Sequence, residues 1–409
     1  DKGYRPFDRL TQFGGPMFGV FNKEEMDSID HWLDWRIATQ SVSVGSPFVS
    51  NFAPMPEYNS TTEGGLAIPP CSERVTAPVS WNRRTANLVR WLTDALPWHD
   101  RCHNRQLFHL LIQPDLTMDT LDQARLRVER VLKSAHRSTH GKNLFNPRGF
   151  DYSPAKFAQQ IVQIHSQEIA KYKPLNAKPT LRREEYMWGI RQFAPAILVD
   201  GSWLQHLGEA TNQDRRIQRL LFRIYAEELG EGIIDWNHPC IYRKLLEDLS
   251  IELPAVDSLE FAMHENFVDS AFDLPSYLLA ISHFPRTYLP EILGLNLAIE
   301  LSGLGGVYMR LAEELRFWKI DPLIISLHLA IDNLAGGHAA MACEAIQSYM
   351  DEVLNLGGTD MAENLWKRIG SGYRSLFTVT RAFKLALLMG FLKEFMPQRV
   401  VSLLSNLGK

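Results

Sequence analysis

Apolar residues recur at helical spacing along most of the chain after Trp81, and this pattern predicts helices. Within TLDQARLRVERVLKSAHR, apolar residues repeat with a period of roughly 3.6 positions. Farther on, Ser153 precedes PAKFAQQIVQIHSQEIAKY, where proline takes the first helical position, a typical helix start. Because neither strand-like alternation nor a fixed-period repeat is found, the sequence favours an all-α bundle over an α/β fold or a solenoid.

The second part of the chain is the most regular. Short breaks separate long apolar segments that predict helices at 181–208, 213–229, 238–249, 258–283, 288–315, 322–350 and 360–406. By contrast, residues 1 to 80 are rich in turn formers and contain little periodicity. Pro174 and Pro179 punctuate the chain between the two parts. We therefore expect an N-terminal extension over 1–178, loop-rich and then helical, and a main helical domain over 179–409.

Composition narrows the class of protein. The 409 residues are 45% hydrophobic, with 43 basic against 47 acidic side chains, and no run of like charge predicts a nucleic-acid or membrane partner. Four widely spaced cysteines are not typical of a secreted disulfide scaffold. The first residues, DKGYRPFDRL, do not resemble a signal peptide, and no run of 18 apolar residues occurs. These features predict a soluble, cytoplasmic protein with a small-molecule partner.

Several metal-binding side chains interrupt the apolar segments. His328 and Asp332 in HLAID are four residues apart, so they share one face of a helix. Glu228 in IYAEELGEG comes shortly before His238 in DWNHPC, and Glu300 stands inside the apolar run LGLNLAIELSG. A buried carboxylate is costly unless it is paired, and carboxylates that converge from several helices usually hold cations. A mixed carboxylate and imidazole shell in a bundle suits iron or manganese.

Each of these residues also has a simpler interpretation. A single histidine or glutamate on an amphipathic helix is more often a partly exposed residue than a ligand. Glu228 lies near Glu227 and Glu231, a pattern that fits a solvated acidic helix end. His99 and Asp100 in PWHDRCHN favour a different class, an HD-type metal-dependent hydrolase, although that chemistry needs further ligands that the sequence does not identify.

Three motifs in order carry a resemblance to a known family. The runs IYAEELGEG with NHPCIYRKLLEDL, then LPEILGLNLAIEL, then LHLAIDNLAGGHAAMACEAI resemble the iron-containing redox enzymes of the heme-oxygenase-like diiron oxidase superfamily. The resemblance covers roughly residues 180 to 350. It implies a helical fold like that of heme oxygenase, two Fe(II) ions per chain in place of heme, and dioxygen as cosubstrate.

The resemblance also implies a ligand set. Carried over residue by residue, the metal ligands would be Glu228, His238, Glu300, His328, Asp332 and His338. His338 lies six residues after Asp332, where the family commonly has three, so Gly336 and Gly337 must supply a break. Glu228 and His238 are ten residues apart, so the segment containing Gly230 and Gly232 must unwind. Asp235 is a reserve ligand, and Glu344 is a weaker one.

The ligand types predict roles and a reaction class. Carboxylates can change between bridging and terminal binding while imidazoles keep each ion attached, so we expect Glu300 and Asp332 to bridge or shift and Glu228 to be terminal. The resemblance implies N-oxygenation, desaturation or C–C cleavage of a small amine, amino-acid-derived or fatty-acid substrate. Among these, an amino-acid-derived substrate is slightly favoured, and arginines available for its carboxylate are Arg191, Arg223, Arg286 and Arg310.

Two further expectations concern partners and alternatives. An external electron donor and a homodimer are possible partners, the latter because TRAFKLALLMGFLKEFMPQRVVSLL is strongly apolar. Besides the HD-like hydrolase, the contrasting hypothesis is a non-catalytic helical module that binds a protein partner and no metal.

Overall fold

The described part of the chain is entirely helical in its regular elements. The computed structural model describes residues 101–395 apart from 139–143, 146–149, 151, 209–214, 304 and 335. The chain divides into two compact units, Asp1–Asn82 and Arg83–Lys409, and every described residue lies in the second. The expected all-α bundle is confirmed. His99 and Asp100, which favour an HD-type hydrolase, lie outside the described residues.

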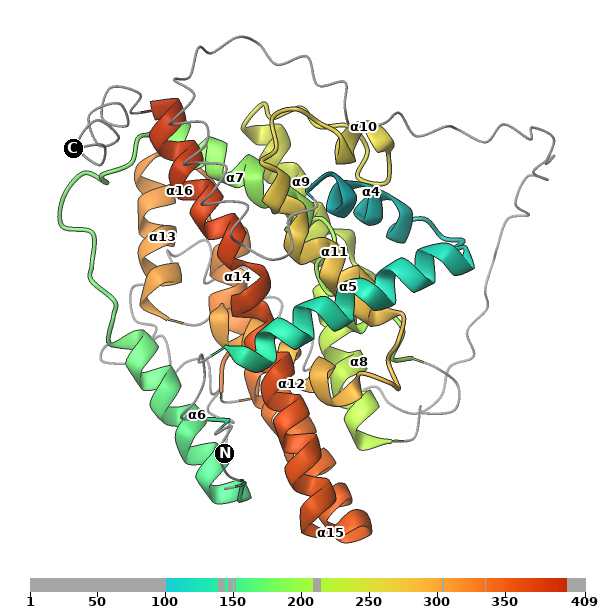
Figure 1. Cartoon of the computed structure of the whole chain (residues 1–409). Helices are drawn as coiled ribbons and strands as arrows, with labels where there is room; N and C mark the ends of the chain where they lie inside the picture. The colour runs from blue at the N-terminus through green and yellow to red at the C-terminus, as the bar shows by residue number, and fades with distance from the viewer. Residues whose placement is uncertain are drawn as a thin grey trace, which may run out of the picture. The chain divides into compact units, whose positions relative to one another are not determined.

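Turns and longer loops join the helices (Figure 1). The α-helices of the described residues are, in chain order, α4 (Arg101–Leu111), α5 (Met118–Arg137), α6 (Pro154–Ile169), α7 (Arg183–Ile197), α8 (Arg216–Glu228), α9 (His238–Asp248), α10 (Leu259–Ala262), α11 (Asp273–Ser282), α12 (Leu289–Ser302), α13 (Gly306–Phe317), α14 (Leu323–Ile331), α15 (His338–Val379) and α16 (Arg381–Phe395). The 3₁₀ turns among them are η1 (Ser202–Leu204), η3 (Gly230–Gly232), η4 (Ile234–Trp236) and η5 (Asp269–Phe272).

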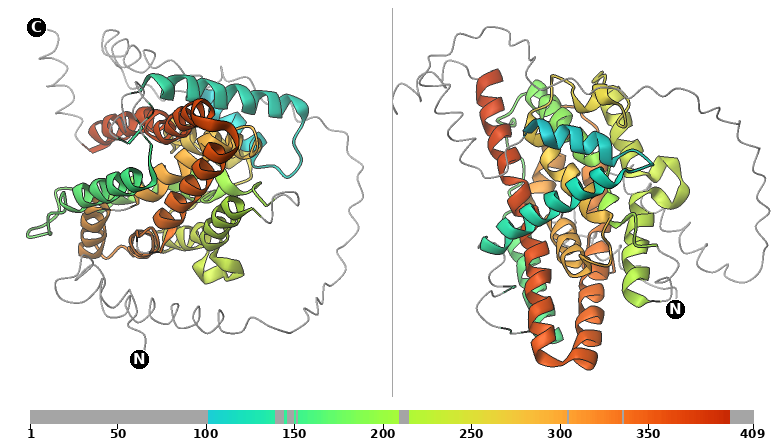
Figure 2. Two further views of the ribbon diagram at one scale, coloured as in Figure 1. Left: turned by 90° about the horizontal axis from the view of Figure 1, so that it is seen from below. Right: turned by 45° about the vertical axis from the view of Figure 1, so that its right-hand side comes forward.

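Helix α12 is the centre of the bundle. Eleven of its 14 residues are buried, which is expected of a helix that is apolar on every side. Its main partner is α15, which leaves helical geometry at Gly358, where φ is 71°. The chain reverses there, and the two limbs of α15 run side by side (Figure 2). One limb begins at the centre of the bundle with His338, which places that residue in the interior.

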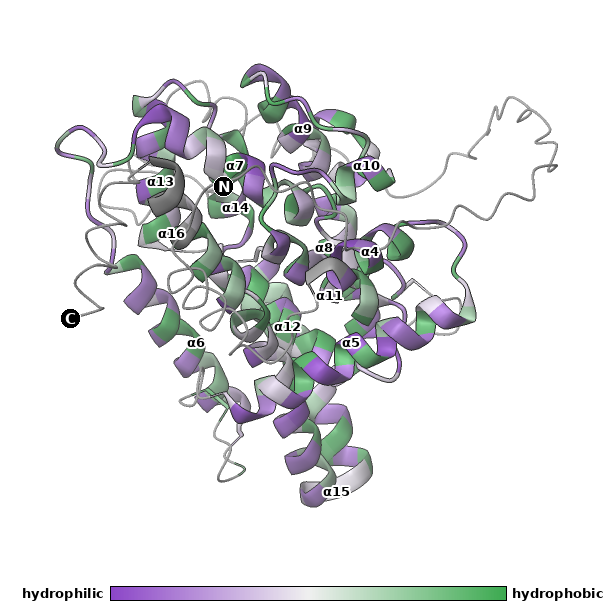
Figure 3. Ribbon diagram, turned by 45° about the horizontal axis from the view of Figure 1, so that its top comes forward, coloured by the Kyte–Doolittle hydropathy of each residue, from purple (hydrophilic) through white to green (hydrophobic). Residues whose placement is uncertain are grey.

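Helices α4 and α5 share this core with the later helices. Polar and apolar residues alternate along α5 at helical spacing (Figure 3), and its buried side includes Val128 and Val131. Two buried arginines join α5 to later helices. Arg127 of α5 donates to the carbonyl of Asp273 at the start of α11, and Arg374 of α15 donates to the carbonyl of Ala135 in α5. The expected division between 1–178 and 179–409 falls inside this second unit, where helices from both sides of it pack together.

The predicted helices exist, but most are interrupted. The predicted segment 181–208 ends as α7 at Ile197, 288–315 is divided between α12 and α13, and 322–350 is divided between α14 and α15. Periodicity misses such breaks because apolar residues continue on both sides of them. The polar residues singled out above lie at or near these interruptions.

Among the described residues, no single helix is both long enough and apolar enough to cross a membrane. The consecutive pair α12 and α13 meets both conditions only jointly, across a 48° bend.

Candidate metal centre

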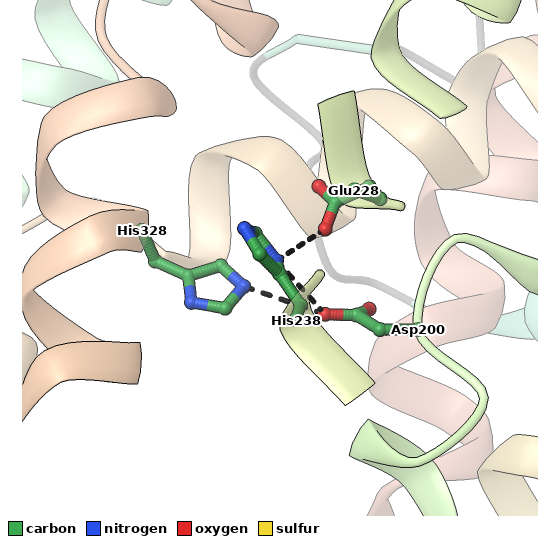
Figure 4. A group of neighbouring side chains, drawn as sticks. All are labelled: Asp200, Glu228, His238 and His328. Atoms are coloured by element: carbon green, nitrogen blue, oxygen red, sulfur yellow. Dashed lines mark ion pairs between the residues drawn. The ribbon is translucent and has the colours of Figure 1, made fainter. Parts of the chain in front are cut away.

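Two groups of acidic and imidazole side chains meet inside the bundle. We call Asp200, Glu228, His238 and His328 the outer group, and Glu228, Glu300 and His338 the inner group; within each, one ligand atom per residue lies within 4.8 Å of the others. Figure 4 shows the outer group, whose members come from four separate segments and point toward one another. Glu228 belongs to both groups, so the two possible ion positions are neighbours.

The outer group is organised around His238, the first residue of α9. Its Nδ1 lies 2.5 Å from Oε2 of Glu228 and 3.5 Å from Oδ2 of Asp200. Nε2 of His328, on α14, lies 3.5 Å from the same oxygen of Asp200. The side chains of Asp200 and His328 are 17% and 19% exposed, so this group reaches solvent on that side.

The inner group is organised around His338, the first residue of α15. Its Nδ1 lies 3.1 Å from Oε1 of Glu228 and 3.3 Å from Oε2 of Glu300. Asp332 lies beside the group, with Oδ1 3.4 Å from the same nitrogen. The side chains of His338 and Glu300 are 0% and 1% exposed, so this group is enclosed.

A short loop between α8 and α9 brings Glu228 and His238 together. Gly230 and Gly232 both adopt positive φ, and the unwinding expected there is confirmed. Gly230 has no room for a side chain, because a Cβ would lie 2.6 Å from the backbone nitrogen of Asn237. Asn237 closes the loop: its Oδ1 caps α9 by accepting from the amide of Cys240, and its Nδ2 donates to the carbonyl of Leu229.

Two other helix ends position Asp332 and His338 at the site. Helix α14 ends at Ile331, so Asp332 is its C-cap and stands one turn after His328. The chain then breaks before His338, and Gly336 has a φ of 146°, which confirms the interruption expected between Asp332 and His338. The carboxylate of Asp332 packs directly on Gly303, the residue after α12: a Cβ there would lie 2.2 Å from Oδ2 of Asp332.

Hydrogen bonds fix which nitrogen of two imidazoles faces the site. Nδ1 of His328 lies 2.6 Å from the carbonyl oxygen of Ile324, which can only accept, so Nδ1 carries the hydrogen and Nε2 faces the outer group. Nε2 of His338 lies 3.1 Å from a carboxylate oxygen of Glu227, so Nε2 donates and Nδ1 faces the inner group. Metal-bound histidines in proteins are typically held in this way.

In the metal-free protein, raised pKa values keep protons on several side chains of these groups. Burial works against charged imidazoles, but the charge of Glu228 and hydrogen bonds to Asp200 and Glu228 together outweigh it and raise the pKa of His238 to about 9. For His328, a hydrogen bond to Asp200 and the charge of Asp332 overcome burial and raise the pKa to about 10. Burial raises the pKa of Glu300 to about 8, and His338 offsets this only in part.

Several atoms of the site are close together without hydrogen bonds. Buried atoms without a hydrogen-bond partner include Nδ1 of His238, Nδ1 of His338 and one oxygen each of Glu228, Glu300 and Asp332. Nδ1 of His238 nevertheless lies 2.5 Å from the oxygen of Glu228, and Nδ1 of His338 lies 3.4 Å from that of Asp332. Donor atoms that share an ion are arranged in this manner, since metal bonds of about 2 Å put neighbouring ligands roughly 3 Å apart. The donor set of nitrogen and carboxylate oxygen therefore fits a pair of first-row metal ions.

All six residues that the sequence predicts as metal ligands lie in or beside the two groups. They are Glu228, His238, Glu300, His328, Asp332 and His338. Their binding of metal stays a prediction. The reserve residue Asp235 is exposed on η4 and belongs to neither group, and Glu344 pairs with Arg216 at the surface.

One residue of the outer group was not found from the sequence. Asp200 follows α7 in the turn LVDGSW, where no helical periodicity marks it as buried. The adjacent Gly201, with a φ of 76°, is the available signal, because glycine there indicates a tight turn that approaches another segment.

The arginines expected near a substrate are partly engaged elsewhere. Nε of Arg223 donates to Glu227 over 2.8 Å, and Nε of Arg310 donates to Glu314 over 2.7 Å. Both pairs span one turn of a single helix. In both pairs the arginine holds a side chain of the bundle itself.

Comparison with known proteins identifies the domain that contains both groups. Residues 187–373 match the family model described as iron-containing redox enzyme, and this range includes every residue from Asp200 to His338 named above. This match supports a heme-oxygenase-like domain that resembles iron-dependent redox enzymes. No curated protein matches the chain.

Proposed function

We propose that this protein is a non-heme diiron oxidase or oxygenase, which uses dioxygen to oxidise a small organic substrate. The observation that carries the proposal is the position of Glu228, whose Oε2 faces His238 of the outer group and whose Oε1 faces His338 of the inner group. A carboxylate with one oxygen toward each of two donor groups is suited to bridge two ions. This arrangement favours a bridging role for Glu228 over the terminal role expected from the sequence.

Charge balance supports two divalent ions. Four ionised carboxylates, those of Asp200, Glu228, Glu300 and Asp332, would match two Fe(II) ions once the three imidazoles are neutral ligands. In the proposed arrangement, Asp200, His238 and His328 hold the outer ion, while Glu300, His338 and Asp332 hold the inner one. When bound, such a pair supplies two reducing equivalents to dioxygen at one place.

The protein's own side chains would exclude water from the site and orient the ligands. Burial of Glu300 and His338 excludes water from the inner position, and the hydrogen bond from Nδ1 of His328 to Ile324 keeps that imidazole turned toward the site. The partly exposed side chains of Asp200 and His328 define the side from which a substrate would approach.

The substrate remains a proposal about chemical class. We favour an amino-acid-derived molecule, oxidised by N-oxygenation, desaturation or C–C cleavage, whose carboxylate would need a cationic partner such as an arginine. An external electron donor would be needed to return the irons to the ferrous state in reactions that use more electrons than the substrate provides.

A direct test is iron loading under anaerobic conditions followed by exposure to oxygen. The proposal expects two Fe(II) ions per chain and a transient visible absorption that forms only after oxygen is added. A protein that takes up no iron would instead support the non-catalytic module, and hydrolytic activity without oxygen would support the metal-dependent hydrolase. Addition of candidate amino acids, amines and fatty acids then identifies the substrate class, since the correct substrate accelerates decay of the transient.

A further inference from the structure

His338 is held from two sides by consecutive residues of α8. Nδ1 of its fully buried imidazole faces Oε1 of Glu228 over 3.1 Å, whereas Nε2 lies 3.1 Å from Oε2 of Glu227. Successive side chains on a helix diverge by about 100°. At the end of α8 this divergence lets Glu227 and Glu228 reach opposite nitrogens of one ring.

We propose that Glu227 is a positioning residue, which fixes the ring orientation and tautomer of His338 so that Nδ1 is presented to the inner ion. The inference rests on the proposed ligand role of His338. Because a carboxylate can only accept, the bond to Glu227 requires the hydrogen on Nε2 and leaves Nδ1 as the atom that can bind a metal.

Glu227 is itself held in place by Arg223. Nε of Arg223, one turn earlier on α8, donates to Oε1 of Glu227 over 2.8 Å, while Oε2 accepts from His338. Each carboxylate oxygen thus has its own partner, and rotation of the carboxylate would weaken both bonds. Glu227 is 8% exposed and Arg223 is 47% exposed, so the series Arg223, Glu227 and His338 leads from the surface to the enclosed inner group.

The chain contains a matched control for this arrangement. Glu344 on α15 also pairs with an arginine of α8, through two bonds of 2.7 and 2.9 Å from Arg216. Both members of that pair are well exposed, at 64% for Arg216 and 42% for Glu344. A surface ion pair of this kind contributes little to stability, so its loss tests the general effect of removing a glutamate between these helices.

The experiment is an anaerobic Co²⁺ titration followed by visible absorption, in which Glu300→Gln identifies the binding phase of the inner group. Glu227→Leu removes the acceptor for Nε2 and is expected to weaken that phase by about 10- to 100-fold, with a changed ligand-field band. Glu227→Gln keeps the side-chain volume and one acceptor oxygen, so it should recover part of the affinity. Glu344→Gln should leave both phases unchanged.

Other outcomes would contradict either the positioning role of Glu227 or the proposed function on which it rests. Unchanged affinity of the inner phase in Glu227→Leu would overturn the positioning role, as would an equal weakening of both phases or the same loss in Glu344→Gln. A wild-type protein that binds no Co²⁺ and no iron would contradict the proposed function itself. Thermal unfolding of each variant without metal verifies that the bundle is intact in the titration.

Discussion

The outer and inner groups use similar side chains in different surroundings. Both combine imidazole with carboxylate and both include Glu228, yet Asp200 and His328 of the outer group are partly exposed, whereas Glu300 and His338 are enclosed. An ion in the inner group is shielded from solvent exchange by the core, and one in the outer group is accessible. From this difference we expect an ion in the inner group to exchange slowly, and an ion in the outer group to be the one that substrate and dioxygen can reach.

Substitution of the shared residue should have the largest effect. Glu228→Gln keeps the side-chain volume but loses the charge that faces both groups, so we expect iron content to fall from two ions per chain to nearly none. Iron analysis after anaerobic loading measures the number of ions bound per chain. Glu363→Gln, in an exposed ion pair with Lys367, is the control. Retention of both ions in Glu228→Gln would remove the basis for a common bridging ligand.

Substitutions in one group should separate the two positions. His328→Ala removes an outer imidazole and should leave one ion per chain, held by Glu300, His338 and Asp332. Glu300→Gln should leave one ion in the outer group instead. A chelator should remove the ion that remains in His328→Ala more slowly, because that ion is enclosed. Equal removal rates in the two variants would contradict the difference in accessibility.

A more limited effect is expected at Gly303. Its φ of −71° suits alanine, but the added Cβ would lie 2.2 Å from Oδ2 of Asp332, so the carboxylate must move away from the inner group. Gly303→Ala should weaken inner Co²⁺ binding by about 10-fold. Gly189→Ala, inside α7 with nothing within 4 Å of the added Cβ, is the matched control and should bind normally. Normal binding in both variants would show that Asp332 is dispensable.

The smallest expected effect is the release of protons when metal binds. With pKa values raised to about 9 for His238 and about 10 for His328, both imidazoles are in the cationic form at pH 7.5 in the metal-free protein. A metal ion binds the neutral imidazole, so binding must release protons, and affinity should increase as pH rises toward these values. Calorimetry of Co²⁺ binding in buffers of different ionisation enthalpy measures the release. Heats that do not depend on the buffer would contradict it.

Much of the site follows from residue types and order along the chain. The bundle class, the interruption between Asp332 and His338, and the unwinding after Glu228 were all expected, because spacings of six and ten residues do not place two side chains on one face of a continuous helix. Glycine at both places supported the same conclusion. Glu300 was recognisable because it interrupts an otherwise apolar helix.

Other features depend on tertiary contacts that periodicity does not contain. Glu227 and Glu228 look like a solvated acidic helix end in the sequence, yet they are 8% and 3% exposed, because α15 begins directly against them. Asp200 follows its helix in a turn, so its proximity to His238 and His328 depends on packing between distant segments. The position of Glu228 between the groups likewise depends on where α9 and α15 begin.

The ends of helices, more than their middles, surround the candidate metal centre. Helices α8, α12 and α14 finish at Glu228, Ser302 and Ile331, so three carboxyl-terminal ends with partial negative charge lie near the carboxylates. The starts of α9 and α15 oppose them in part. Backbone dipoles therefore add to the repulsion among the acidic side chains, and an arriving cation relieves both at once. Metal binding should accordingly tighten the helix termini, which slower amide hydrogen exchange would reveal around residues 229–237 and 332–334.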